Sequence, residues 1–405
     1  MRQHPRLKLP DVFDRDMKLL LYSMASRRVV MGFLQVVRAI YFALLGFDPI
    51  TIGFLLSIAA FVGAVHSITF GLLSDRFGRK AFLLLGGFFA TMRLVIFALS
   101  TDFWLLALGQ GVGALGEGVG AGQPVVSGYI TDKTNSRKRA PVFGTLAVTN
   151  AIATTVGNLM ASLPTYFQES LRLNMVEAHS LLFWFGIVAS AASLLLIIPI
   201  EEVKLKKGRQ REVKRGFLEV KSWDVIGRFS LVRSTSGLGW GLIGSLLPLY
   251  FFIRFDVGTE TLGPIYAVTR FLSIFSYLLM PRIVERFGDI STIIASRLLT
   301  AGLTAAFPMT GSYPLAVALL IVFRTIILFT MPIRQSFATG IVAPEETATV
   351  IGISSFSRMT LRSIAPTLAG YMFETLSLSL PFLSGAGLMA VNAILYRAFF
   401  QPKNK

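Results

Sequence analysis

The stretch GLLSDRFGRK, residues 71–80, is a short polar segment between two long apolar runs. A shortened copy, ERFG at residues 285–288, stands between two apolar runs in the second half of the chain. Gly53 lies 25 residues before Gly78, the last glycine of the first copy. Gly263 lies 25 residues before Gly288, the last glycine of the second copy. This repetition indicates a chain built from two similar halves.

The composition around this repeat is that of a membrane protein. Of 405 residues, 53% are hydrophobic and only 15% charged, against about 25% charged in a typical soluble protein. A chain with this composition cannot cover a soluble fold with polar surface, so an all-α polytopic membrane protein is expected. Runs long enough to cross a bilayer fall at residues 18–46, 50–73, 80–101, 102–130, 141–164, 178–200, 233–254, 260–281, 291–310, 313–337, 349–372 and 377–400.

The basic residues outside these twelve spans predict the orientation. Twenty-seven Lys and Arg lie on the side that holds both termini, and two lie on the other. The positive-inside rule therefore predicts cytoplasmic termini in an integral protein of the plasma membrane. Because no single domain concentrates the net charge of +17, nucleic-acid binding is not expected. The basic segment 201–232 divides the chain into predicted bundles of residues 1–200 and 233–405.

Further pairs extend the repeat, because Pro332 follows Pro124, and Pro366 follows Asn158, by 208 residues each. Parallel six-span repeats are typical of transporters that bind their solute between two bundles. The segment 71–80, the spans and the repeat resemble the major facilitator superfamily over nearly the whole chain. The resemblance implies twelve transmembrane helices in two pseudo-symmetric six-helix bundles, alternating access and a functional monomer, with membrane lipids around it.

The resemblance also implies a cytoplasmic gate. In this family the carboxylate equivalent to Asp75 faces the N-terminus of the eleventh span and helps to close the cytoplasmic side. Residues 132–144 match a second family pattern, whose copy in the other half has Thr347 in place of the arginine. The expected gate residues are Gly71, Asp75, Arg76, Gly78, Arg79, Asp132, Arg139, Glu285 and Arg286.

The charged residues inside the spans are mostly arginines. When Lys and Arg at the span ends are counted with the loops, ten arginines but no lysines remain there, and Glu117 is the one clearly internal acid. A charge in the membrane is costly and normally faces a cavity or a partner. In the resembled fold, eight of these arginines fall on cavity-lining spans. The expected substrate cavity consists of Arg28, Gln35, Arg38, Glu117, Arg270, Arg324, Gln335, Arg358 and Arg362.

These charges predict the substrate class and the coupling. Forked guanidinium donors suit carboxylate or phosphate groups, so an anionic or amphiphilic organic solute is expected. Glu117, placed between apolar surroundings and arginines, is the predicted proton-coupling residue, with His66 as the next candidate. Each arginine has a structural alternative, in which it caps a helix or extends to the membrane surface.

Catalysis, metals and cofactors are not expected. The chain has no Cys and three His, which leaves no metal-ligand set and no nucleophile with a base. Residues 111–116 fit the Gly-x-Gly-x-x-Gly pattern of nucleotide-binding proteins. They lie inside an apolar span with no strand nearby, so close helix packing is the better interpretation.

The sequence therefore favours a secondary active transporter, coupled to protons, that moves a small organic solute. Two alternatives remain. One is a multidrug/proton antiporter that exports drugs, although Ala107 and Asn158 depart from patterns frequent in such exporters. The other is a non-transporting membrane receptor or lipid scramblase on the same fold.

Overall fold

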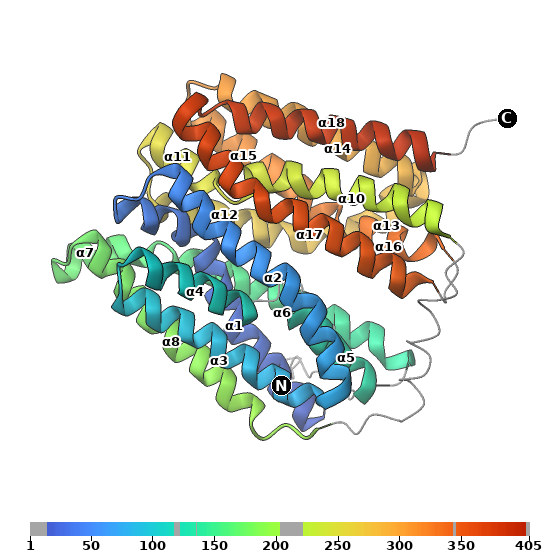
Figure 1. Ribbon diagram of the computed structural model, residues 1–405, viewed down its shortest axis with the longest axis horizontal. Helices are drawn as coiled ribbons and strands as arrows, with labels where there is room; N and C mark the ends of the chain where they lie inside the picture. Colours follow the sequence, from blue (N-terminus) through green and yellow to red (C-terminus); the bar gives the residue numbers. More distant parts are fainter. Residues whose placement is uncertain (1–13, 117–121, 135, 203–221, 343–345, 402–405) are drawn as a thin grey trace, which may run out of the picture.

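A computed structural model describes residues 14–116, 122–134, 136–202, 222–342 and 346–401. These residues are almost entirely helical, and no strand occurs among them. Two groups of helices lie side by side, with α2 and α17 crossing where the groups meet (Figure 1). The N-terminal bundle comprises α1 (Arg15–Leu44), α2 (Pro49–Phe77), α3 (Arg79–Leu99), α4 (Phe103–Gly116), α5 (Gly122–Lys133), α6 (Ser136–Met160), α7 (Leu163–Leu171) and α8 (Met175–Ile197).

The C-terminal bundle repeats this order with more interruptions. It comprises α10 (Trp223–Gly244), α11 (Leu247–Phe255), α12 (Thr259–Leu272), η1 (Ser273–Phe275), α13 (Ser276–Phe287), α14 (Asp289–Ala306), η2 (Phe307–Met309), α15 (Tyr313–Phe329), α16 (Met331–Gly340), α17 (Thr347–Tyr371), the π-helical turn η3 (Met372–Leu376) and α18 (Leu380–Phe400). The all-α fold expected from the sequence is confirmed.

Both bundles turn sharply at equivalent glycines. Gly78 joins α2 to α3 with a φ of 102°, and Gly288 joins α13 to α14 with a φ of 78°. These positive φ values are strained for residues that carry a Cβ. The two copies of the repeated segment therefore serve as the same kind of turn.

Side chains at the helix starts explain where several helices begin. Asp14 accepts a hydrogen bond from the Met17 N–H (2.8 Å) at the start of α1. Asp48 accepts one from the Thr51 N–H (2.7 Å) at the start of α2. Such carboxylates satisfy N–H groups that have no partner within the helix.

Seven helical segments among the described residues are long and apolar enough to cross a membrane. The spans that fall short are α1, the pairs α4/α5, α12/α13 and α15/α16, and α17. They are short, interrupted or polar, and α1 and α17 carry arginines within the helix. The helices α4 and α15 are apolar and fall short only in length.

The seventh span begins earlier than the sequence suggested. The helix α10 starts at Trp223 rather than at residue 233. Arg228 and Arg233, which were counted with the basic linker, are therefore helical residues of the C-terminal bundle. Hydropathy placed the start too late because this first part of the helix is polar.

The ends of the molecule differ, and two names are used for them below. The linker face is the end where α8 finishes at Ile197 and α10 starts at Trp223. The far face is the opposite end, which carries α7 and the turns after α1 and α17 (Figure 1).

Candidate functional site: the space between the bundles

Toward the far face the two bundles are joined by hydrogen bonds. Between α2 and α17, the Ser57 hydroxyl accepts bonds from the N–H (3.0 Å) and the hydroxyl (2.8 Å) of Thr367. Between α6 and α12, the Ser162 hydroxyl donates to the Glu260 carbonyl (3.1 Å). Two helix pairs therefore close this end of the space between the bundles.

Equivalent small residues allow these helices to approach. A Cβ on Gly53 of α2 would overlap the main chain of Pro366 in α17. A Cβ on Gly263 of α12 would lie 2.6 Å from the carbonyl oxygen of Asn158 in α6. Gly53 and Gly263 are repeat partners, as are Pro366 and Asn158. The pseudo-symmetry seen in the sequence therefore recurs in the contacts between the bundles.

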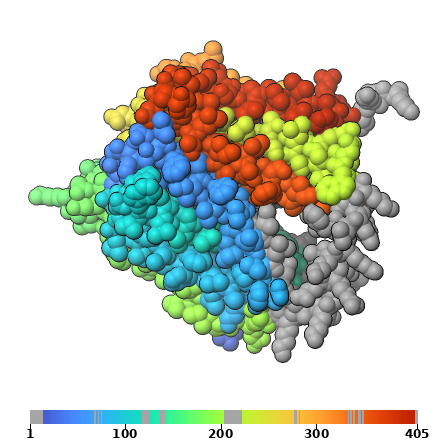
Figure 2. All heavy atoms as spheres, in the orientation of Figure 1, coloured from blue at the N-terminus to red at the C-terminus, as the bar shows by residue number. Residues whose placement is uncertain are grey.

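Toward the linker face, the described residues of the two bundles stand apart. Figure 2 shows the surface hollowed between the linker-face ends of α2 and of α10 and α17. Gly144 and Gly352, which are repeat partners, have no atom within 4 Å of an added Cβ. The exposed fractions of Phe77, at the end of α2, and of Phe356, in the linker-face half of α17, are 65% and 45%. The space between the bundles is thus closed at the far face and hollow at the linker face.

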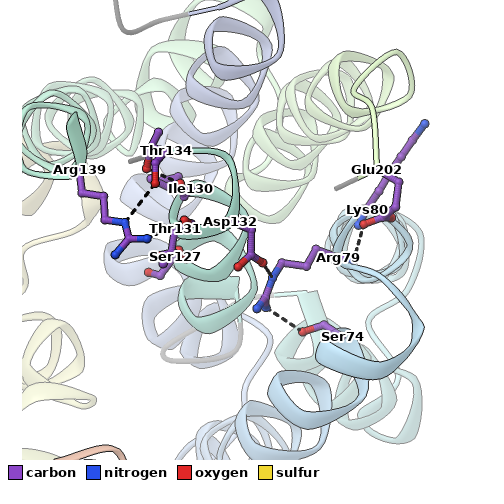
Figure 3. Close-up of polar contacts among 10 residues, drawn as sticks. All are labelled: Ser74, Arg79, Lys80, Ser127, Ile130, Thr131, Asp132, Thr134, Arg139 and Glu202. Carbon is purple, nitrogen blue, oxygen red and sulfur yellow. Dashed lines mark hydrogen bonds and ion pairs between the residues drawn. The ribbon is translucent and has the colours of Figure 1, made fainter. Parts of the chain in front are cut away.

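The expected gate brings Arg79 and Asp132 together (Figure 3). Arg79 Nε lies 2.6 Å from the Asp132 carboxylate, and both side chains are at least nine-tenths buried. A second guanidinium nitrogen of Arg79 donates to Ser74 Oγ (3.4 Å). This ion pair joins the start of α3 to α5 and to α2.

Glu202 completes this corner, which the sequence did not indicate. Its carboxylate accepts the main-chain N–H groups of Arg79 (2.8 Å) and Lys80 (2.9 Å) at the N-terminus of α3. A negative charge is stabilised at a helix N-terminus. The first residues after α8 are therefore tied to the same turn as the segment 71–80.

The remaining gate residues of the first half do not converge on this pair. Arg139 donates to the carbonyls of Thr134 (3.3 Å) and Thr131 (3.0 Å), so it caps the end of α5. Arg76 is exposed and lies over the Phe77 ring. Gly71 and Asp75 belong to α2, but their side-chain surroundings lie outside the description, so the lock on the eleventh span stays a prediction.

The gate residues of the second half form no such pair. Glu285 and Arg286 are exposed, and neither makes an ion pair with the residues described. Arg286 instead lies over the Phe287 ring, 5.4 Å from its centroid. Among the described residues, Glu285 and Arg286 therefore form no counterpart of the polar corner around Arg79.

A second polar corner escaped sequence analysis. Lys133 pairs with Asp16 and lies 3.1 Å from Asp14. The Glu201 N–H also donates to Asp16 (3.3 Å). Burial raises the pKa of the Asp16 carboxyl, but the hydrogen bonds from Lys133 and Glu201 outweigh it and hold the pKa below 3.8. Spacing could not reveal this cluster, because its members lie far apart in the chain.

The expected cavity residues of the N-terminal bundle form local contacts. Arg38 donates to its own helix at Leu34 and reaches Gln110 of α4 at 3.5 Å. Gln35 donates to the Asn158 side chain of α6 (2.5 Å). Arg28 is partly buried in α1. Glu117, the predicted coupling residue, lies outside the described residues.

Two arginines of the C-terminal bundle make close contacts within it. The Arg324 guanidinium lies 3.6 Å from the centroid of the Tyr266 ring and donates to the Thr269 hydroxyl (3.3 Å). Arg334 donates to the carbonyls of Ile327 and Thr330 at the break between α15 and α16. Arg334 thus follows the structural alternative, in which an arginine satisfies helix-end carbonyls.

The other expected cavity residues of this bundle differ in how far they are described. Arg270, at the end of α12, is partly buried. Gln335 lies in α16 with its side-chain surroundings outside the description. Arg358 and Arg362 lie one turn apart in α17 and make no hydrogen bond or ion pair through their side chains within the described part of the chain.

Two residues join this group that the sequence did not single out. Arg233 of α10 donates to Ser355 of α17 (3.0 Å). Arg297 of α14, with an exposed fraction of 5%, donates to Ser236 of α10 (2.7 Å). Hydropathy placed Arg233 at the very start of the seventh span, and the resemblance assigned Arg297 to a peripheral span. Neither assignment predicted that these two residues lie in one region of the C-terminal bundle.

Two other sequence features lie in the N-terminal bundle. Gly113 and Gly116 of α4 pack so closely on α3 that an added Cβ would overlap Arg93 and Ala90, as expected for helix packing. His66 is buried beside a small cavity that Arg27 and Gly116 also line. Its two ring nitrogens have no hydrogen-bond partner in the described structure.

Comparisons with known proteins agree with this architecture. A class H tetracycline resistance protein of Pasteurella multocida is 24% identical over 256 residues, and the match covers 60% of either chain. A solved single-residue variant of the nucleoside transporter NupG is 15% identical, with a TM-score of 0.77, over 96% of this chain and 100% of that one. An inward-facing bacterial homologue of the lysosomal transporter Spinster is 15% identical, with a TM-score of 0.69, over 95% and 94%.

The repeated bundles and the space closed at one end define an integral membrane transporter. The model of the Major Facilitator Superfamily matches residues 20–366, and the chain belongs to this superfamily. The match with the first of these relatives spans less than two thirds of that protein.

Proposed function

We propose that this protein is a secondary active transporter that moves a small anionic or amphiphilic organic solute across the plasma membrane. The observation that carries the proposal is the asymmetry of the space between the bundles. It is closed by α2–α17 and α6–α12 contacts at the far face and hollow at the linker face. Alternating access requires two such states, and the repeat supplies a second, symmetry-related set of contacts.

The basic residues support an orientation for this state. Of the Lys and Arg outside the predicted spans, 27 lie on the side of the linker face. With that face in the cytoplasm, the structure is an inward-open state. Arg79, Asp132 and Glu202 then belong to the cytoplasmic end, where closing the gate would bring α2 toward α17.

The arginines support an anionic solute. Arg358 and Arg362 have donors that no carboxylate occupies among the described residues, and both are only partly buried. A cationic solute near them would be repelled, whereas a carboxylate or phosphate would be attracted. Glu117 remains the proposed site of proton coupling.

Transport by purified protein in proteoliposomes tests the proposal. We expect the wild type to accumulate a radiolabelled organic anion against its gradient when a pH gradient is imposed. Glu117→Gln should bind the same anion but equilibrate it without accumulation. Accumulation by Glu117→Gln at normal folded yield would refute its coupling role. Failure of every anion to move, with cations transported instead, would refute the substrate class.

A drug-exporting antiporter is the second candidate. The observation that favours it is the similarity to tetracycline resistance proteins of Pasteurella multocida and Escherichia coli. Expression in a drug-sensitive bacterial strain separates the two candidates. A drug exporter raises the inhibitory concentration of tetracycline, whereas an importer of organic anions leaves it unchanged.

A further inference from the structure

Four arginines from four helices gather inside the C-terminal bundle. They are Arg233 of α10, Arg297 of α14, Arg334 of α16 and Arg358 of α17, and they are called the arginine cluster below. Arg233 donates to Ser355 of α17, one turn before Arg358, and Arg297 donates to Ser236 of α10, one turn after Arg233. Arg334 lies on α16, which contacts both α17 and α14. Arg362 adjoins Arg358 one turn along α17.

Among the described residues, no carboxylate forms an ion pair with these arginines. Within the described residues, the acids that form ion pairs are Asp14, Asp16, Asp132 and Asp224, and none of them pairs with the cluster. The side-chain partners of the cluster are neutral, the hydroxyls of Ser355 and Ser236. The Nε donors of Arg233, Arg297 and Arg358 are buried and have no acceptor.

The surroundings of the cluster are apolar. Val232, Ile293, Ile333 and Tyr396 form a buried hydrophobic cluster on the same helices and on α18. Arg297 itself is 95% buried, since its exposed fraction is 5%. In such surroundings like charges repel strongly and unpaired charges are costly. A group of cations there is stabilised by an anion that replaces the missing carboxylates.

We propose that the arginine cluster is a binding site for a phosphate-type oxyanion. Several guanidinium forks converge here, and each can donate two parallel hydrogen bonds to a tetrahedral oxyanion. A dianion balances more of the cluster's charge than chloride or a single carboxylate does. The phosphate comes either from a water-soluble phosphate or from the headgroup of a membrane phospholipid.

This site shares Arg358 with the proposed cavity and extends from it into the C-terminal bundle. Arg297 belongs to α14, which contacts α18 and α15 of its own bundle rather than the N-terminal bundle. The inference therefore does not rest on the proposed function, and it is tested by binding rather than by transport. It assigns a ligand to Arg233 and Arg297, which the gate and the proposed cavity do not use.

Thermal unfolding of the purified full-length protein in detergent tests the site. A ligand that binds only the folded state raises the midpoint of unfolding. We expect inorganic phosphate to raise the midpoint in a saturable manner, and sodium chloride of equal ionic strength to leave it unchanged. Arg358→Gln should weaken the apparent phosphate affinity about tenfold or more, because a charged hydrogen bond contributes roughly 1.5–3 kcal/mol.

A matched variant controls for the loss of one positive charge. Arg254 caps the carbonyls of Pro308 and Thr310 at the far face, away from the cluster. Arg254→Gln should keep the phosphate affinity of the wild type. If Arg358→Gln does not fold, Arg233→Gln provides a second test, because its described bond is a single one to a serine.

Nanodiscs distinguish the two sources of phosphate. If phosphatidic acid mixed into phosphatidylcholine raises the midpoint and inorganic phosphate then adds nothing, the site takes a lipid headgroup. If only soluble phosphate acts, the site takes a soluble phosphate. No stabilisation by either source would overturn the proposal, as would equal responses of Arg358→Gln and Arg254→Gln.

Discussion

At the scale of single residues, one guanidinium joins three helices of the N-terminal bundle. Arg79 begins α3, forms an ion pair with Asp132 of α5 and reaches Ser74 of α2. Its main-chain N–H is held by Glu202. The segment 71–80 therefore contributes a structural joint of this bundle.

Removal of the carboxylate from this joint should destabilise the protein. We expect Asp132→Asn to lower the free energy of unfolding by roughly 3 kcal/mol, because a buried arginine then loses its counter-charge. Arg139→Gln, which removes only bonds to carbonyls, should cost about 1 kcal/mol. Unfolding in mixed micelles with increasing SDS measures both. Equal losses of unfolding free energy in the two variants would contradict the larger contribution expected from the buried pair of Arg79 and Asp132.

The corner around Asp16 should make stability depend on pH. The pKa of Asp16 is lowered in the folded state, so its contribution is present above about pH 4 and is lost as the pH falls through the folded pKa. Burial lowers the pKa of Lys133, but its bonds to Asp16 and Asp14 outweigh this and raise it. That contribution is present below about pH 10.5 and is lost at higher pH.

The difference in thermal midpoint between wild type and Asp16→Asn measures this dependence. We expect a constant difference between about pH 5 and pH 10 that shrinks toward pH 3. Asp14→Asn is the matched control, because Asp14 is half exposed and asparagine also caps helices well. A difference that persists undiminished at pH 3 would assign the effect of Asp16→Asn to something other than its charge.

At the scale of elements, hydropathy located the helices but not their interruptions. The long apolar helices α2, α3 and α8 lie close to their expected ranges. The breaks at η1 and between α15 and α16 were missed, because an apolar run reads alike whether its helix is continuous or broken. Hydropathy also placed the start of α10 too late. The first part of this helix is polar, and packing stabilises it as a helix.

The two helix pairs at the far face provide a test of alternating access. We expect Gly53→Ala and Gly263→Ala to separate the bundles there, because each added methyl group overlaps the main chain of the opposing helix. Spin labels at cysteines replacing Asp102 and Ser377, which are exposed at the far face of opposite bundles, report the distance. The population of longer distances should rise.

Gly144→Ala is the control for this experiment. Its Cβ meets nothing within 4 Å, so the distance distribution should stay that of the wild type. If all three alanine variants gave the wild-type distribution, contacts other than these glycines would hold the far face closed.

At the scale of the whole molecule, the orientation in the membrane can be measured directly. The chain has no cysteine, so single cysteines can be introduced without background. We expect Glu169→Cys in α7 to react with an impermeant maleimide in intact cells. Asp224→Cys at the start of α10 should react only after permeabilisation. The opposite pattern would reverse the proposed orientation and make the structure an outward-open state.

The sequence alone determined the class of this protein, because hydropathy, charge asymmetry and an internal repeat are properties of order along the chain. It predicted the repeat partners Gly53 and Gly263, Asn158 and Pro366, and the family to which the chain belongs. It also selected Arg79 and Asp132, which the structure joins as an ion pair.

Only the tertiary structure decided which repeat partners touch, which end of the molecule is closed, and which arginines share one site. Arg233 and Arg297 are 64 residues apart, at the start of one predicted span and in a predicted peripheral span. They meet Arg358 because α10, α14 and α17 belong to one bundle. Contacts of this kind depend on how helices pack across long sequence separations, which periodicity within a single helix does not encode.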